Sequence, residues 1–119
     1  MKRADPPPDI SPRDFFTHWV PEAVARDEVR RHKLGSTDAL IEFTLEGPAG
    51  GVYSLRIVEG EVRGFDGASR DANLRVRVDV STWRRLNAGI VTAPEALLKR
   101  ELHVSGDLLL ALKLHLILG

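Results

Sequence analysis

Between residues 38 and 79, apolar and polar side chains alternate along the chain. A period of two residues is typical of β-strands that bury one face and leave the other in water. Short glycine-containing turns separate the first three alternating segments, so we expect these segments to form an antiparallel meander. A longer polar loop precedes the fourth segment. The four predicted strands cover residues 41–45, 53–57, 61–65 and 74–78.

Helical spacing replaces this alternation on both sides of the strands. In the segment 11–33, apolar side chains recur at spacings of three and four, and Pro21 predicts a kink or two short helices. This order of elements predicts an α+β layer structure. After the fourth strand, the sequence predicts a helix capped by Ser81, a short helix over 93–98, a fifth strand over 101–104 and a final helix over 107–118.

The final helical segment is apolar almost all the way round. Lys113 and His115 point to opposite sides of it, and leucines fill most of the remaining circumference. A helix of this kind is expected to be buried. One face can pack on the sheet, and the other face then needs a second helix, a partner chain or a ligand. The spacing alone leaves these three alternatives open.

Composition excludes several classes of function. The chain has 17 basic and 17 acidic residues and no cysteine, so thiol chemistry is excluded and nucleic acid is not an expected partner. The most apolar run, 108–118, is too short to span a bilayer, so we expect no stable membrane insertion. We also expect a cytoplasmic location and a single domain over 11–119, after a disordered or extended leader over 1–10, which contains three consecutive prolines.

No catalytic or metal-binding pattern is found in the sequence. The four histidines lack the spacing of a metal site, and no Gly-x-Ser-x-Gly elbow or phosphate-binding glycine loop occurs. We therefore expect a protein that is not an enzyme, with no metal and no cofactor. The carboxylate of Asp107 is expected to stabilise the first turn of the last helix.

Several stretches, in order, resemble one known family. Residues 41–45 and 51–57 resemble the opening meander of the sterol carrier protein two family, and 82–89 with 93–97 resemble its short helices. Residues 102–114 resemble its closing strand, Gly-Asp corner and apolar helix. The resemblance implies a mixed five-stranded sheet, with a crossover after the meander and helices packed on one face. It also implies that the chain binds a fatty acyl, sterol, phospholipid or prenyl chain in an apolar tunnel and catalyses no reaction.

The resemblance gives candidate positions for the tunnel between sheet and helices. Trp83 either lines this cavity or anchors its helix on the sheet. The aromatic stretch around Phe16 and Trp19 either covers the tunnel mouth or forms a homodimer interface. The candidate lining residues are Phe43, Leu45, Tyr53, Leu55, Val76, Trp83, Leu86, Leu97, Leu109, Leu112 and Leu116.

Two alternatives to a general lipid carrier remain. In one, the chain is an interaction or dimerisation module that buries its final and N-terminal helices against a second chain and holds no ligand. In the other, the resemblance implies an accessory lipid chaperone in ubiquinone synthesis.

Overall fold

A computed structural model describes residues 5–118 of the chain. The strands are β1 Ala39–Glu46, β2 Gly51–Val58, β3 Glu61–Asp66, β4 Leu74–Asp79 and β5 Leu102–Gly106. The N-terminal helices are α1 Pro12–Asp14, the π-helix η1 Phe15–Trp19, α2 Val20–Ala25 and α3 Glu28–Leu34. The later helices are α4 Val80–Asn87, α5 Ala93–Leu98, α6 Leu108–Ala111 and α7 His115–Leu118.

The five strands form one mixed sheet in the order β3-β2-β1-β4-β5. Strands β1, β2 and β3 pair antiparallel, which confirms the predicted meander. Strand β4 pairs parallel with β1 and antiparallel with β5. The predicted α+β fold class is therefore confirmed, and the connection from β3 to β4 must cross two strands.

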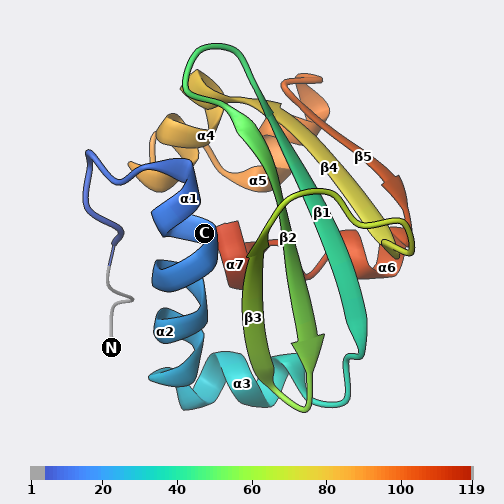
Figure 1. The fold of residues 1–119 in the computed structure, drawn as a ribbon. Helices are drawn as coiled ribbons and strands as arrows, with labels where there is room; N and C mark the ends of the chain where they lie inside the picture. The colour runs from blue at the N-terminus through green and yellow to red at the C-terminus, as the bar shows by residue number, and fades with distance from the viewer. Residues whose placement is uncertain (1–4, 119) are drawn as a thin grey trace.

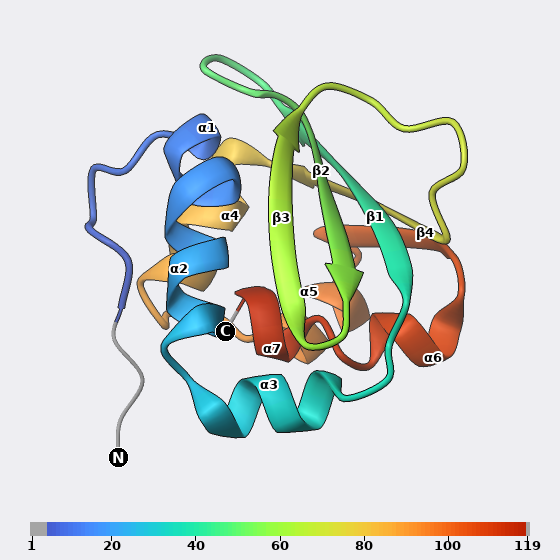
Figure 2. The ribbon, with the colours of Figure 1, turned by 60° about the horizontal axis from the view of Figure 1, so that its bottom comes forward.

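Helices cover one face of this sheet, and the strands alternate accordingly. Along β1, Ile41, Phe43 and Leu45 are buried, whereas the residues between them are partly exposed. Figure 1 shows α4 to α7 behind the sheet and the helical stretch from α1 to α2 along the β3 edge, and Figure 2 shows α3 below the sheet. The apolar side chains of β1, β2 and β4 thus face a helical layer.

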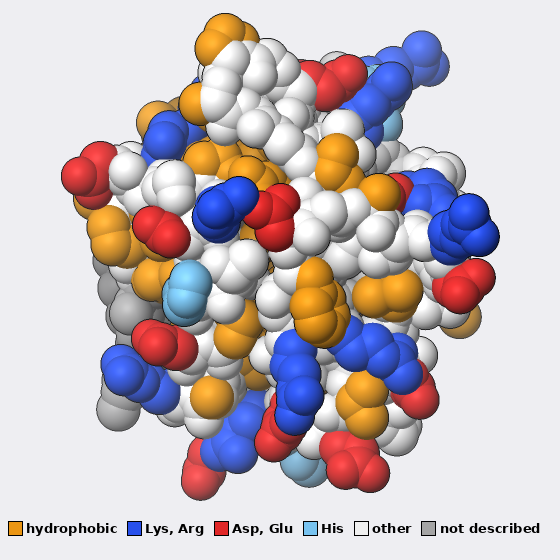
Figure 3. Space-filling view, in the orientation of Figure 1, with side chains coloured by type: hydrophobic (Ala, Val, Ile, Leu, Met, Phe, Trp, Pro, Cys, Tyr) orange, Lys and Arg blue, Asp and Glu red, His pale blue; other side chains and the backbone are white. Residues whose placement is uncertain are grey.

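The opposite, open face of the sheet carries ion pairs between neighbouring strands. Figure 3 shows basic and acidic side chains interspersed on this side of the molecule. The pair Arg75–Glu42 measures 2.5 Å and the pair Arg77–Glu46 measures 3.8 Å. The Arg77–Glu46 pair is exposed, and an exposed pair contributes about 0–1 kcal/mol. The crossover loop is held on the same face, because the Ser69 N–H donates to the Glu42 carboxylate over 3.1 Å.

The N-terminal helices lie very close to β3. A Cβ atom placed on Gly64 would lie 1.9 Å from the carbonyl oxygen of Phe16, so only glycine allows this approach of backbone to backbone. At Pro21, where a kink or two short helices are predicted, the α-helical pattern is interrupted by the π-helix η1, and α2 begins at Val20 with Pro21 in its first turn. The Val20 N–H bonds to the Phe15 carbonyl in a π-helical turn, and the helix continues through Pro21 to Ala25. The chain turns before Asp27, whose carboxylate caps α3.

The prediction of one continuous helix over 107–118 is wrong. The segment forms two helices of four residues each, α6 and α7, with a turn between them. The carboxylate of Asp107 caps α6 by accepting from the N–H groups of Leu109 and Leu110, over 3.0 and 3.1 Å. In the turn, the Lys113 ammonium donates to the Thr37 hydroxyl over 2.7 Å. The turn lets both halves of the segment bury side chains, which are Leu110, Leu114, Leu116 and Ile117.

Residues ahead of α1 are tied to the domain. The guanidinium of Arg84 donates to the carbonyl oxygens of Pro8 and Ile10, over 3.1 and 2.7 Å. Residues 1–4 of the predicted leader lie outside the described residues.

Helix α4 begins after Asp79 rather than after Ser81. The Ser81 hydroxyl donates to the Asp79 carboxylate, and this hydrogen bond holds the pKa of Asp79 below its usual value.

Candidate functional site

The floor of the candidate site is one row of side chains across the sheet. Phe43 of β1 is paired with Tyr53 of β2 on one side and with Val76 of β4 on the other. All three side chains are buried on the inner face, as are Leu45 and Leu55 beside them. The five candidate lining residues that lie on strands are therefore close together, on neighbouring strands.

Aromatic side chains from the helices pack on this floor. The ring of Phe16 stacks on Tyr53 at 5.3 Å between centroids and lies 4.7 Å from Phe43. Phe15 packs edge-on against Trp83 at 5.3 Å and stacks with Trp19 at 5.6 Å. Six of the seven aromatic side chains of the protein thus form one connected cluster between sheet and helices.

The two residues expected at the mouth of the site have different environments. Phe16 is fully buried and contacts the floor, and its predicted place at the tunnel mouth stays a prediction. The widened π-helical turn and the absence of a side chain at Gly64 bring this part of the helix down onto β3. Trp19 is only partly buried and packs against the core.

The candidate lining residues that lie on the helical segments divide into two groups. Trp83, Leu86 and Leu116 are buried, and Leu97 packs partly buried against the same core. Leu109 and Leu112 are 77% and 72% exposed in this structure, so their place in the lining stays a prediction. Leu110 and Leu114 of the same segment are buried in the core instead.

The sequence analysis did not identify Asn87 as a candidate. This residue lies one helical turn after Trp83 on α4. Among the described residues, neither the indole Nε1 of Trp83 nor the amide Nδ2 of Asn87 has a hydrogen-bond partner, although both atoms are buried. A buried donor without an acceptor lowers the stability of the fold by about 1–3 kcal/mol. The only signal in the sequence was the spacing of four residues, which places both side chains on one face of α4.

Tyr53 is the only tyrosine of the chain, so its ionisation can be followed directly. Burial raises the pKa of its phenol above the usual 10.0, the Asp66 carboxylate raises it further, and the Arg13 guanidinium opposes them. Arg13 forms an ion pair with Asp66 at this edge of the sheet. The phenol therefore lies where the row of floor side chains meets charged groups.

The midpoint for phenolate absorbance in the folded protein should accordingly lie above pH 10, and unfolding in urea should return it to about 10. Because the folded state holds the phenolic proton more tightly, this contribution to stability is full below pH 10 and is lost as pH rises through the raised pKa. Replacing Asp66 with asparagine should lower the pKa of Tyr53, since it removes a negative charge. A folded midpoint at or below the unfolded one would contradict this account.

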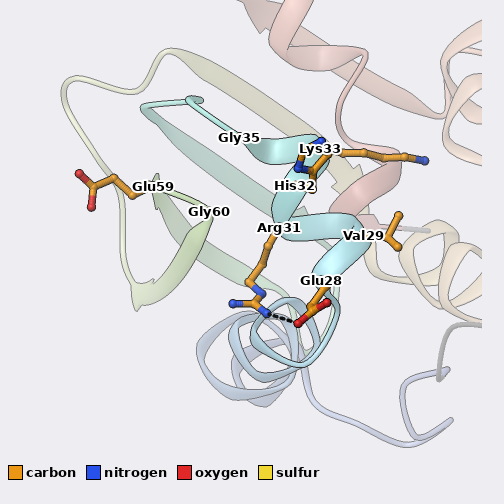
Figure 4. A pocket seen from close by; sticks show the side chains of 8 residues that line it. All are labelled: Glu28, Val29, Arg31, His32, Lys33, Gly35, Glu59 and Gly60. Carbon is orange, nitrogen blue, oxygen red and sulfur yellow. Dashed lines mark ion pairs between the residues drawn. The ribbon is translucent and has the colours of Figure 1, made fainter.

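A hollow lies away from this layer, between α3 and the β2–β3 turn. It has a volume of about 650 Å³ and is lined mainly by polar and charged residues. Figure 4 shows that Glu28 and Arg31 form an ion pair here, whereas Glu59 and Lys33 point away in different directions. Because the side chains do not converge, this hollow offers no geometry for holding an apolar ligand or a single polar group.

The described residues also lack two other kinds of feature. In residues 5–118, no three histidine or acidic side chains come together as potential metal ligands. No helix within the same range is long and apolar enough to cross a membrane.

Comparison with known families decides what kind of domain this is. The model of the SCP-2 sterol transfer family matches residues 20–119, which is most of the chain. The chain belongs to this family. The resemblance predicted from the meander, the short helices and the Gly-Asp corner is therefore confirmed. No curated protein sequence matches the chain significantly.

Solved structures share the fold of this SCP-2 family chain at low sequence identity. Palmitated SCP2L2 from Aedes aegypti is 17% identical, with a TM-score of 0.70 over 92% of this chain and 96% of its own. UbiJ-SCP2, a ubiquinone synthesis protein, is 16% identical, with a TM-score of 0.61 over 84% of this chain and 86% of its own. The sec-alkylsulfatase Pisa1 from Pseudomonas sp. is 19% identical, with a TM-score of 0.68 over 92% of this chain.

The sulfatase is much longer than the chain described here. The matched region makes up 16% of the sulfatase chain, so the SCP-2 family chain spans only a small part of that enzyme's length. At these identities, the solved structures show that the fold is shared.

Proposed function

We propose that the chain is a cytoplasmic, non-catalytic carrier that binds an apolar, lipid-like molecule between the inner face of the sheet and the helices. The observation that carries this proposal is the continuous apolar layer formed by the row Tyr53, Phe43 and Val76 and the aromatic side chains above it. Membership of the SCP-2 sterol transfer family supports the same conclusion.

The chemistry of this layer suits a long hydrocarbon chain. Each methylene group that leaves water contributes about 0.8 kcal/mol, so a chain of many methylenes binds without directional contacts. Fatty acyl and prenyl chains are the ligand classes proposed. The palmitated form of the Aedes aegypti neighbour supports the first, and the ubiquinone synthesis neighbour supports a role with prenylated quinone precursors. Selectivity among chain types should be loose, because the described lining is almost wholly apolar.

The segment from α6 to α7 is the proposed movable wall of the site. Helices of four residues are not stable by themselves, so this segment is held mainly by its buried leucines and Ile117. The exposed leucines of the same segment, Leu108, Leu109 and Leu112, leave apolar surface in water. A shift of the segment would let Leu109 and Leu112 cover a bound chain, which is the position that the sequence analysis assigned to them.

A titration with a fluorescent long-chain acyl probe tests the proposed function. The probe signal is read together with the emission of Trp19 and Trp83, the only two tryptophans. Saturable binding of one probe per chain at micromolar concentration, reversed by hexadecanoate or a prenyl quinone precursor, is expected. No binding by protein shown to be folded and free of lipid would contradict the carrier function.

A second candidate function rests on the same exposed leucines. Leu108, Leu109 and Leu112 are 67%, 77% and 72% exposed, and such a group of apolar side chains also suits the interface of a homodimer. In that case the chain would be an interaction module without a ligand. A dimer that persists at nanomolar protein concentration and binds no acyl probe would favour the module over the carrier.

A further inference from the structure

The unpartnered donors of α4 point to the chemistry of the ligand's polar end. We propose that Trp83 and Asn87 form a polar subsite that holds an oxygen acceptor, such as the carboxylate of a fatty acid, at one end of the apolar layer. This inference rests on the proposed lipid-binding function and narrows its ligand class to amphiphiles with an acceptor group at one end.

The first argument is the burial of the two donors. Trp83 is 0% exposed, and its indole Nε1 has no acceptor among the described residues. The Nδ2 atom of Asn87 is buried and has no acceptor within the same range. Buried polar groups in folded proteins are nearly always hydrogen-bonded, so each exception calls for a partner. Two exceptions on one helix are explained together by a single ligand group.

The second argument is geometry. Residues four positions apart on a helix have Cβ atoms about 5–6 Å apart and lie on the same face. Trp83 and Asn87 have this spacing on α4, which contacts β1 and β4. A carboxylate has two oxygens and several lone pairs, so it can accept from an indole N–H and an amide N–H₂ at once.

The third argument is charge. The guanidinium carbon of Arg84 lies 4.9 Å from the centroid of the Trp83 ring. The same guanidinium donates to the carbonyl oxygens of Pro8 and Ile10, which fixes its position beside the indole. A fixed positive charge beside the Trp83 indole favours an anionic head over a cationic one. The proposed ligand is therefore a long-chain carboxylate whose head lies against α4 and whose chain lies along the floor of the sheet.

The test compares two competitors of one fluorescent acyl probe. Hexadecanoate and hexadecane, both supplied from cyclodextrin, have chains of the same length, and only the first carries an acceptor. The intact protein should bind hexadecanoate at least tenfold more tightly. Trp83→Phe and Asn87→Leu should each weaken hexadecanoate binding roughly tenfold, the effect expected for one lost hydrogen bond to a charged group. Asn87→Leu should leave hexadecane binding unchanged, and Trp83→Phe should weaken hexadecane binding far less than hexadecanoate binding. Ser81→Ala, on the exposed part of the same helix, is the matched control and should change neither affinity.

Two further readouts separate a ligand-binding role from an ordinary structural one. In nitrogen NMR spectra, the Trp83 indole N–H resonance, assigned with Trp83→Phe, should move downfield when hexadecanoate binds and should not move with hexadecane. Asn87→Leu should raise the melting temperature of the ligand-free protein by about 4 °C, because a buried unpartnered amide is removed. A structural hydrogen bond at Asn87 predicts the opposite shift.

The outcomes distinguish the subsite from the proposed function. If both competitors displace the probe equally, or if the variants weaken both alike, the chain is a carrier and the polar subsite is refuted. If neither competitor binds and no probe binds, the carrier function fails and the subsite fails with it. Preference for hexadecanoate that is lost in both variants, with the downfield indole shift, establishes the subsite.

Discussion

Replacing Gly64 with alanine should lower the free energy of unfolding by about 3 kcal/mol, among the largest effects expected for a one-carbon change. A Cβ atom at this position would lie 1.9 Å from the Phe16 carbonyl oxygen and 2.8 Å from the Cα of Thr17. Both neighbours are backbone atoms, so no side-chain rotation relieves the clash. The helix must instead move away from β3, and Phe16 must lose its contacts with the floor of the sheet.

Urea unfolding followed by circular dichroism measures this loss. Arg63→Ala is the matched control, because Arg63 is the preceding residue on β3 and is exposed. That substitution should change the free energy of unfolding by no more than about 0.5 kcal/mol. If Gly64→Ala lowered the free energy of unfolding no more than Arg63→Ala, the close contact between η1 and β3 would not exist in solution.

Replacing Leu112 with serine should weaken binding of the acyl probe by about 2 kcal/mol, or roughly thirtyfold, if α6 and α7 close over the ligand. Leu112 is 72% exposed, so the same change should leave the stability of the ligand-free protein within about 0.5 kcal/mol of the original. Such a separation of binding from stability is expected only of a residue that becomes buried when the ligand is present. Probe titration and thermal unfolding of the same sample measure both quantities.

Leu98→Ser provides the control for this prediction. Leu98 is 86% exposed on α5 and lies outside the segment proposed to move, so its replacement should alter neither binding nor stability. If Leu98→Ser weakens binding as much as Leu112→Ser, general surface hydrophobicity attracts the probe. If neither change has an effect, α6 and α7 do not cover the ligand.

The sheet was predictable because the alternation of apolar and polar residues is a local property of each strand. Ile41, Phe43 and Leu45 are buried as their spacing indicates. At Gly64, the same alternation also indicates where a helix packs closely on the sheet. The inward side of β3 carries glycine where a large apolar residue is expected, and a missing side chain on an inward position indicates a close approach of another backbone.

The C-terminal segment could not be predicted from composition, because its leucines all favour a helix and give no break. The turn there depends on contacts with distant residues, such as the hydrogen bond from Lys113 to Thr37. Leu110, Leu114 and Leu116 are buried, whereas Leu109 and Leu112 are exposed. The exposure of Leu109 and Leu112 is thus a property of tertiary packing rather than of helix propensity.

The sequence predicted the apolar side chains that the strands contribute to the candidate site, but it did not predict the polar pair formed by Trp83 and Asn87. An apolar floor follows from the strand pattern, whereas an asparagine near the end of a helix is an ordinary residue in a sequence. Asn87 became a candidate only because the fold buries its amide, like the indole of Trp83, without an acceptor. Burial of a particular atom depends on every element packed around it, so no local pattern reveals it.

The most direct test of the account is to locate a bound acyl chain by NMR. Contacts are measured between the methylene protons of hexadecanoate and the protein in a saturated complex. We expect nuclear Overhauser effects from the chain to the rings of Phe43 and Tyr53 and to the Trp83 indole, which form the floor and the α4 side of the apolar layer. Contacts confined to exposed residues, such as Val29 beside the hollow at α3, would contradict binding between the sheet and the helices.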